Sequence, residues 1–435
     1  MPMAWYFGPP ISGRRDDSAM ASSNTSRDSQ TNRWLLRRLH RLIGSPPVRL
    51  AVGDGDPYPA DRTEAPATVR IDGLRTLLSL AMNPEVGFGE AYSDGRIEVE
   101  GDLVLLLERV LESMPEGGPS RRARLFSRWL DWAQANTLRG AAKNIHHHYD
   151  LNVDFYKLWL DSRLVYTCAY FPDEATTLEQ AQLAKMDHVC RKIRLQKGEH
   201  VVEAGCGWGA LALHMARHYG ARVTAFNISH EQIEFARERA RKEGLDRQVE
   251  FVEDDYRNIT RRYDAFVSVG MLEHLGAENY QALGEVIERT IGDTGRGLLH
   301  FIGRKRPHAF SPWIRKRIFP GAYAPSLAES LGVLEPWDYA VLDVENLRLH
   351  YARTLECWLR RYENAWNDVV KMFGENFARA WRLYLAGSIA AFRSGNLQLF
   401  QIVFAGERCR QIPWTRAYLY SEQDDENSPW IRAIS

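Results

Sequence analysis

Three glycines at alternate positions follow a short apolar segment in the run His200-Val201-Val202-Glu203-Ala204-Gly205-Cys206-Gly207-Trp208-Gly209. The apolar residues predict a buried β-strand, and the residues that follow have the periodicity of a helix. Glycine lets the backbone turn sharply and approach a bound molecule where a Cβ would collide with it. Such a turn, between the first strand and the first helix of an open α/β sheet, is where nucleotide-like cofactors bind. The G-x-G-x-G spacing favours S-adenosylmethionine over a dinucleotide.

Strands and helices alternate regularly from Glu199 onward. Strands are expected at 201–202, 222–226, 249–253, 265–269 and 297–301, with helices up to His218, from Ser229 and over 278–290. Ser229 and Gln232 have the capping-box spacing, and Gly244 stops the helix. This pattern predicts a parallel, doubly wound, Rossmann-like sheet of the α/β class. After Gly303 we expect an insertion rich in Trp and Arg, then long helices to about Arg393.

The composition is that of a globular chain without a global charge. The 435 residues would make two or three domains at ~150 residues each. Lys plus Arg and Asp plus Glu both number 56, so we expect no nucleic-acid partner. The five cysteines are far apart in the sequence, which argues against disulfides and against a metal site and is consistent with a reducing cytoplasm. No apolar stretch approaches the ~20 residues of a membrane span, and no signal peptide is evident.

The amino-terminal third suggests a tail and a small domain. Residues 1–30 are polar and predict disorder, and 33–43 form a basic amphipathic segment within a first region of 1–45. That segment either lies on anionic lipid or packs on the next domain, and we favour packing. Residues 46–114 predict a small α+β domain with a glycine-rich turn before Ile97. A linker at 115–120 leads to a large domain over 121–420.

Several further motifs, in order, resemble the cyclopropane-fatty-acyl-phospholipid synthase family, which includes mycolic acid cyclopropane synthases. The resemblance covers roughly residues 120–405 and implies a class I methyltransferase fold. A segment at 87–92 with 98–101 looks like the small amino-terminal domain of the members that act on phospholipids, and implies a lipid-facing domain. The matching stretches are 148–150, 166–171, 203–209, 227–232, 255–257, 267–274, 299–303, 312–321 and 351–358.

The resemblance implies that the methyl carbon of S-adenosylmethionine is added across a cis double bond of an unsaturated phospholipid acyl chain. Closure of a cyclopropane ring then needs a base, and in this family a bicarbonate ion serves. An alkene must be held close to the methyl donor, and water must be kept from the developing cation. The family's bicarbonate site corresponds to main-chain groups of Cys168 and Ile302 and to the side chains of Glu273, His300 and Tyr351.

The same resemblance assigns residues to the cofactor. Gly205, Gly207 and Gly209, with Cys206 between them, would admit the methionine and ribose portions close to the main chain. The remaining residues surround the ligand, with Glu203 in place of the family's usual Asp: Tyr166 and Thr167 toward the methionine moiety, Asn227 and Gln232 toward the ribose, and Asp255 and Tyr256 toward the adenine.

Two positions depart from the family pattern. Leu151-Asn152-Val153 stands where a Gly-Asn pair is common, and Ser388 stands where some members have a cysteine, which argues against a covalent thiol step. The departures leave the product open, which could also be a methylene- or methyl-branched fatty acid. Two other functions remain as alternatives: a catalytically silent lipid-binding protein and a soluble small-molecule methyltransferase.

Cations and apolar groups interleave at 304–306 and 313–319, near the presumed mouth of the site. This pattern predicts either a transient membrane contact or a solvated basic face with packed aromatics. We expect a cytoplasmic enzyme at the inner membrane face, and a homodimer is left open.

Overall fold

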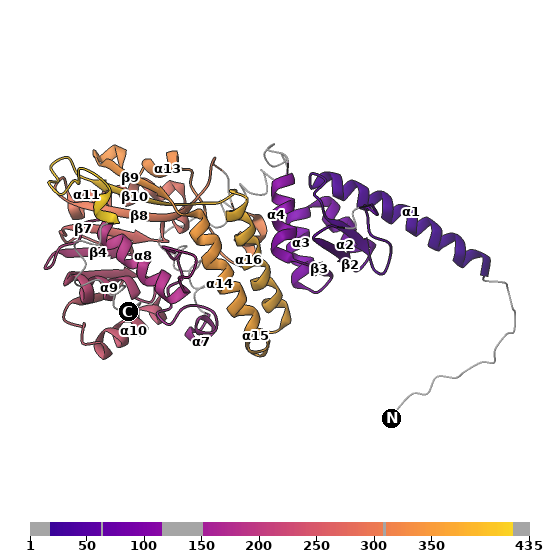
Figure 1. The fold of residues 1–435 in the computed structure, drawn as a ribbon, viewed down its shortest axis with the longest axis horizontal. Helices are drawn as coiled ribbons and strands as arrows, with labels where there is room; N and C mark the ends of the chain where they lie inside the picture. Colours follow the sequence, from indigo (N-terminus) through magenta and orange to yellow (C-terminus); the bar gives the residue numbers. More distant parts are fainter. Residues whose placement is uncertain (1–17, 62–63, 115–150, 308–309, 421–435) are drawn as a thin grey trace, which may run out of the picture.

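The structure is a computed structural model that describes residues 18–61, 64–114, 151–307 and 310–420, with side chains from Gln30 onward. A small amino-terminal unit lies beside a larger α/β unit (Figure 1). The predicted linker, the helix pattern that follows it and the motif at 148–150 lie outside the described residues. Within the described ranges, no helix has both the length and the apolarity of a membrane span.

The small unit is a three-stranded sheet in the order β1-β2-β3. β1 runs parallel to β2, with Arg49 opposite Thr68, and β3 runs antiparallel to β2. The α1 residues Leu35, Leu36 and Leu39 are buried, so the basic segment packs on this unit, as favoured above. The elements are α1 (Ser18–Leu42), β1 (Arg49–Val52), β2 (Ala67–Ile71), α2 (Leu74–Met82), α3 (Pro84–Ser93), β3 (Ile97–Gly101) and α4 (Leu103–Ser113).

Two expectations for this unit were wrong. Residues 18–30, expected to be disordered, belong to α1, because a helix nucleated by a buried face extends at little cost per added residue. The expected glycine-rich turn is the helix α3, which begins with Pro84 after the cap Asn83. A Cβ on Gly89 would lie 2.4 Å from Cδ1 of Trp313, so this glycine permits close packing and makes no turn.

The larger unit contains a seven-stranded sheet in the order β6-β5-β4-β7-β8-β10-β9, which confirms the doubly wound α/β fold. Strands β4 to β8 are parallel, whereas β10 is antiparallel to both its neighbours. The strands are β4 (His200–Ala204), β5 (Arg222–Asn227), β6 (Val249–Glu253), β7 (Ala265–Val269), β8 (Arg296–Gly303), β9 (Ala340–Asn346) and β10 (Gln398–Ala405).

The last two strands were not predicted. Every residue of β10 is buried, including Gln398 and Gln401, so its sequence has no two-residue alternation that would separate a strand from a buried helix. β9 follows the insertion, where the pattern suggested helices alone. Its residues are mostly half-exposed, as befits the edge of the sheet.

Helices cover the sheet and connect it to the small unit. Only half of the capping box of α10 forms: Ser229 accepts from the N–H of Gln232, whose own side chain accepts from Asn227 instead. Arg379 on α16 donates to the carbonyls of Tyr92 (2.7 Å) and Ile97 (2.8 Å) and so holds the two units together. The helices are α7 (Val153–Lys157), α8 (Leu178–Lys192), α9 (Ala210–Tyr219), α10 (His230–Lys242), α11 (Tyr280–Ile291), α12 (Pro312–Arg317), α13 (Leu327–Leu331), α14 (Arg348–Asn364), α15 (Trp366–Phe373) and α16 (Glu375–Arg393).

Candidate active site

A cavity opens at the carboxyl ends of β4, β5, β6 and β7, where the loops after these strands converge. Gly205 and Gly207 follow β4 with φ values of +85° and +50°, which side chains rarely adopt. A Cβ on Gly205 would lie 3.1 Å from Cβ of Met271. The glycine loop therefore leaves room for a ligand over the main chain.

All predicted cofactor residues except Gly209 line this cavity. They are Tyr166, Thr167, Glu203, Gly205, Cys206, Gly207, Asn227, Gln232, Asp255 and Tyr256. A Cβ on Gly209 would lie 2.6 Å from the Phe251 ring and 2.8 Å from Cβ of Ala236, inside the core. Gly209 thus allows α9 to pack closely and does not line the cavity, and its place beside the cofactor stays a prediction.

The polar groups after β5 and β6 are largely paired. Asn227 donates to Oε1 of Gln232 (2.7 Å) and to the Gly207 carbonyl (3.4 Å), so it braces the glycine loop. Asp255 accepts from the guanidinium of Arg257 at both carboxylate oxygens, each at 2.8 Å. The hydroxyl of Tyr256 is buried and has no hydrogen-bond partner among the described residues, which leaves it available to a ligand.

Tyr166, Thr167, Lys185 and Glu203 gather at the opposite end of the cavity. Nζ of Lys185, on α8, donates to Oγ1 of Thr167 at 3.0 Å. Burial lowers the pKa of Lys185 to about 8 and raises that of Glu203 to about 8, while the ammonium opposes the rise. Sequence reasoning missed several lining residues. Asp254 directly follows β6 and could have been found from its place, whereas no strand directly precedes the others: Lys185, His274, Asn279 and Phe319.

Glu273, predicted to orient the base, follows β7 and is buried. Its Oε1 accepts from the N–H of Ile302 at 3.3 Å, and its Oε2 has no partner among the described residues. Burial raises the pKa of Glu273 to about 7. The N–H of Ile302 therefore fixes the position of the Glu273 carboxylate through this hydrogen bond.

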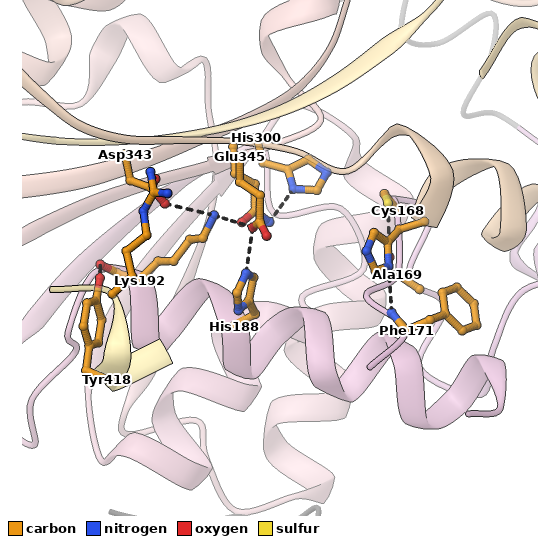
Figure 2. Close-up of polar contacts among 12 residues, drawn as sticks. Cys168, Ala169, Phe171, His188, Lys192, His300, Asp343, Glu345 and Tyr418 are labelled. Carbon is orange, nitrogen blue, oxygen red and sulfur yellow. Dashed lines mark hydrogen bonds and ion pairs between the residues drawn. The ribbon is translucent and has the colours of Figure 1, made fainter. Parts of the chain in front are cut away.

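His300, predicted as a donor to the base, lies two residues before Ile302 on β8. The amide Nε2 of Gln401 lies 2.9 Å from Nδ1 of His300. The other ring nitrogen of His300, Nε2, is buried without a partner in the described part of the chain. Figure 2 shows His188 and Lys192 of α8 pointing toward Glu345 of β9, which is separated from His300 of β8 by the strand β10. Burial, together with Lys185 and Lys192, holds the pKa of His300 well below its usual value, so the imidazole is neutral.

Cys168 and Tyr351, the remaining predicted residues, share one apolar core with Ile302. The segment after Cys168 is tied to α14, because Ala169 N–H donates to Thr354 Oγ1 and Phe171 N–H to His350 Nδ1, both at 3.0 Å. Tyr351 lies on α14 between these two partners. Burial raises the pKa of Cys168 far above its usual value, so its thiol is not a nucleophile.

None of these five predicted residues lines the cofactor cavity. The loop after β7 connects the two regions, since Met271 and His274 line the cavity and Glu273 lies between them. Thr167 lines the cavity and Cys168 follows it directly. Cys168 and Glu273 therefore lie next to residues of the cavity wall, and the base site itself stays a prediction.

Aromatic side chains fill the core next to this region. The hydroxyl of Tyr166 lies 2.9 Å from that of Tyr384 on α16, and Phe319 packs on the Tyr384 ring at 5.5 Å. A continuous series of ring contacts extends from the cavity wall into α14 and α16. It includes Phe155, Tyr156, Trp159, Trp208, Trp358, Tyr362, Phe377 and Trp381.

The basic and aromatic segment at 313–319 matches the alternative of a solvated basic face with packed aromatics, and a membrane contact of this segment stays a prediction. Trp313, Arg315 and Ile318 are buried, and Phe319 lines the cavity. Lys316 and Arg317 pair with Glu90 of α3. The segment packs against the small unit because Gly89 leaves space for the Trp313 indole, an arrangement invisible in the local pattern.

The two departures from the family pattern are accommodated locally. Asn152 caps α7 by accepting from the N–H of Phe155 at 3.0 Å, so the loop keeps its amide cap with Leu151 in place of glycine. Val153 N–H donates to Glu231 at 3.1 Å, which ties this loop to α10 beside the cavity. Ser388 is half-buried within α16 and does not line the cavity.

Comparison with known proteins points to one family. The family model for mycolic acid cyclopropane synthetase matches residues 136–402. The cyclopropane-fatty-acyl-phospholipid synthase of Escherichia coli K12 is 35% identical over 347 residues, covering 78% of this chain and 88% of that protein. A probable fatty acid methyltransferase of Pseudomonas putida is 34% identical over 393 residues, covering 86% of this chain and 96% of that protein.

Solved structures agree with these sequence matches. The cyclopropane synthase MmaA2 from Mycobacterium tuberculosis aligns with a TM-score of 0.59 and 26% identity, over 61% of this chain and 98% of its own. The mycolic acid cyclopropane synthase CmaA1, in complex with SAH and CTAB, aligns with a TM-score of 0.58 and 28% identity, over 60% and 97% of the two chains.

Proposed function

The chain belongs to the mycolic acid cyclopropane synthetase family and is an S-adenosylmethionine-dependent methyltransferase, and from this premise we propose its reaction. It adds the methyl carbon of S-adenosylmethionine to the cis double bond of an unsaturated phospholipid acyl chain and closes a cyclopropane ring. One observation supports a ring-forming, proton-removing site above the others. Two buried polar atoms, Oε2 of Glu273 and Nε2 of His300, have no partner among the described residues, behind the methyl-donor end of the cavity.

The cavity fits S-adenosylmethionine, which supplies the methyl group when bound. Gly205 and Gly207 leave the main chain open, and Oε2 of Glu203 and the hydroxyl of Tyr256 are buried without protein partners in the described chain. Tyr256 and Asn279 would hold the adenosine end, and Tyr166, Thr167 and Glu203 the methionine end. Asn227 acts by bracing the glycine loop.

The residues around Glu273 fit a bicarbonate ion, which supplies the proton acceptor when bound. A carboxylate accepts the hydroxyl of such an ion, and a neutral imidazole donates from its remaining N–H. Glu273 presents the free carboxylate oxygen, held in place by Ile302, while Gln401 bonded at Nδ1 leaves Nε2 of His300 to carry the hydrogen. Tyr351 and the main chain at Cys168 complete the set that we propose.

Burial and aromatic rings protect the reacting chain. Positive charge that develops on an alkylated alkene is captured by nearby water, so the site must be dry. Aromatic faces stabilise such a charge by about 0.5–2 kcal/mol each. The rings of Tyr166, Trp208 and Phe319 line the cavity, and Tyr384 supports two of them.

A methyl- or methylene-branched product is the second candidate. It is favoured by the match to a protein named as a probable fatty acid methyltransferase, which spans more of this chain than the match to the E. coli synthase. Both products need the same cofactor and the same alkene. The cyclopropane and the methylene branch both lose a proton from the transferred methyl group, but the methylene branch first needs a hydride shift between the two alkene carbons, and a saturated methyl branch needs a hydride donor as well. The surroundings of Glu273 therefore decide whether the proton leaves before or after the hydride shift.

We also propose that the small unit meets the membrane that contains the phospholipid, at the cytoplasmic face of the inner membrane. Leu74, Leu78 and Met82 are exposed and recur at every fourth residue of α2, which places them on one face. The neighbouring α1 exposes Trp34 and four arginines, Arg33, Arg37, Arg38 and Arg41, with no acidic residue from Gln30 to Leu42. Cations near an anionic surface contribute about 1 kcal/mol each, and apolar groups insert shallowly.

The membrane proposal is tested by flotation with vesicles that contain anionic phospholipid. We expect Leu74→Glu with Leu78→Glu to reduce the bound fraction several-fold, while Leu349→Glu, at an exposed leucine of α14, leaves it unchanged. Equal binding of the two variants would refute the assignment to α2.

The reaction is tested by expressing the chain in cells whose phospholipids are monounsaturated and analysing fatty acid methyl esters by gas chromatography–mass spectrometry. We expect a new ester that is heavier by one CH₂ and resists hydrogenation under conditions that saturate alkenes. An ester that gains hydrogen would indicate a methylene branch. No new ester, with S-adenosylhomocysteine still bound by the purified protein, would contradict both candidates.

A further inference from the structure

Lys185 is a buried lysine in the wall of the cofactor cavity. It lies on α8, is 2% exposed, and is the only lysine among the lining residues. Its Nζ has three hydrogens, and the structure shows one acceptor for them, Oγ1 of Thr167. Burying an ammonium is unfavourable unless an anion or several acceptors compensate it. Thr167 is a neutral partner and accepts only one of the three hydrogens, so the described residues leave the ammonium of Lys185 without a direct hydrogen bond to an anion.

The position of Lys185 identifies the end of the ligand that it would meet. Along the edge of the sheet, the loops after β6, β5, β4 and β7 follow one another. Asp255 and Tyr256 lie after β6, at the adenosine end. Thr167, the partner of Lys185, lies beside Gly270 after β7, since a Cβ on Gly270 would be 3.0 Å from Cγ2 of Thr167. Lys185 is therefore at the end that receives the amino-acid part of the cofactor.

The charges at this end match that amino-acid part. The buried acidic and basic side chains of the cavity wall are Glu203, whose Oε2 has no partner among the described residues, and Lys185, and each favours the charged form of the other. The methionine moiety of S-adenosylmethionine carries one ammonium and one carboxylate. A wall with one buried group of each sign compensates both ends of such a zwitterion, and the ligand compensates both groups of the wall.

We propose that Lys185 is a cofactor-binding residue whose ammonium receives the α-carboxylate of S-adenosylmethionine. The proposal rests on S-adenosylmethionine as the cofactor and is independent of the acyl substrate and of the base. Gln182, one turn earlier on α8, donates to the carbonyls of Val165 (3.3 Å) and Thr167 (2.9 Å) and so holds the adjoining segment in place. Lys185 is therefore not needed to hold this segment, and the proposal gives it a role in binding the ligand.

A second buried lysine on the same helix supplies the control. Nζ of Lys192 lies 2.7 Å from Glu345 and 3.7 Å from Asp343, and Lys192 does not line the cavity (Figure 2). Its charge is compensated within the protein. Substitution of Lys192 therefore removes a buried ammonium from α8 without touching the ligand.

The test measures binding by isothermal titration calorimetry with two probes, S-adenosylhomocysteine and its decarboxylated analogue S-adenosyl-3-thiopropylamine. We expect Lys185→Gln and Lys185→Met to bind S-adenosylhomocysteine at least about 10-fold more weakly, because a charge-assisted hydrogen bond is lost. Both variants should bind the analogue within about 3-fold of the wild type. Lys192→Gln should keep the wild-type preference for the carboxylate-bearing probe.

Each outcome decides the proposal. Equal weakening of both probes by the Lys185 substitutions would mean that Lys185 only supports the cavity, and would overturn it. Unchanged binding of both probes would overturn it as well. If the wild type binds neither probe, the assignment of the cofactor itself fails. Should Lys185→Met unfold, the smaller change Lys185→Gln carries the comparison, with the melting temperature measured alongside.

Discussion

The cofactor cavity and the pocket around Glu273 lie at the same edge of one sheet, but they are built in opposite ways. The cavity is open, and several of its polar groups are paired within the protein, as Asp255 is with Arg257. The residues around Glu273 are buried, and Glu273 and His300 each have one buried polar atom without a partner among the described residues. The contrast agrees with the proposed reaction: a cofactor that is exchanged each turnover needs access, whereas the proposed proton-removing site needs enclosure, because water would capture the cation.

The largest expected effect separates the two regions functionally. Glu273→Gln removes the acceptor for the hydroxyl of the base, and we expect the turnover rate to fall by about 10²–10⁴-fold. Affinity for S-adenosylhomocysteine should change less than about 2-fold, because Glu273 lies outside the cavity. Calorimetry and a methyl-transfer assay on the same preparation check this. A parallel loss of binding would show that the regions are not separable.

The same substitution tests the enclosure of Glu273 through stability. Burial raises the pKa of Glu273 to about 7, so between its ordinary value and 7 the folded state holds a proton that the unfolded state has lost. The free energy of unfolding must then fall as the pH rises through this window. Glutamine is neutral like the protonated form of Glu273, so the Glu273→Gln variant does not lose unfolding free energy as the pH rises.

We therefore expect Glu273→Gln to be more stable than the wild type at pH 8, by about 3 kcal/mol at most, and equally stable near pH 4. Urea denaturation at the two pH values measures the difference. A constant difference, or a variant that is less stable at pH 8, would mean that the carboxylate is compensated and the pocket is not dry.

The cavity is tested by a matched pair of glycines. Gly205 and Gly198 have φ values of +85° and +86°, so alanine strains both backbones equally. Only at Gly205 would the Cβ meet a neighbour, Met271 at 3.1 Å, whereas nothing lies within 4 Å at Gly198. We expect Gly205→Ala to weaken S-adenosylhomocysteine binding about 10-fold and Gly198→Ala to leave it unchanged. Similar affinities would show that the glycine loop does not shape the cavity.

The smallest effect concerns the contact between the cavity wall and the aromatic core. Tyr166→Phe removes the hydrogen bond to Tyr384, which is worth about 1 kcal/mol of unfolding free energy. Tyr384→Phe should cost about the same, and the double variant no more than either single one, because both remove one bond. Additive losses in denaturant titrations would mean that the two hydroxyls have separate partners.

The sequence predicts the two regions unequally, for a physical reason. The glycine motif by itself places Gly205 in a turn after the first strand of the sheet, whereas the family resemblance assigns Asn227 and Asp255 to the cofactor. The pocket draws Cys168, Glu273 and His300 from distant segments, and only the family resemblance names them together. Lys185 follows no strand, and its burial depends on how α8 packs. β10 was missed because a fully buried strand has no alternation.

The central claim is that the pocket around Glu273 removes a proton from the carbon that the cofactor has delivered. The most direct measurement uses S-adenosylmethionine with a fully deuterated methyl group, vesicles of a monounsaturated phospholipid and mass spectrometry of the product. The account predicts that two of the three deuterons remain in the product, in a ring that resists hydrogenation. A product that retains all three deuterons would contradict it, because the proton would then have left from another carbon.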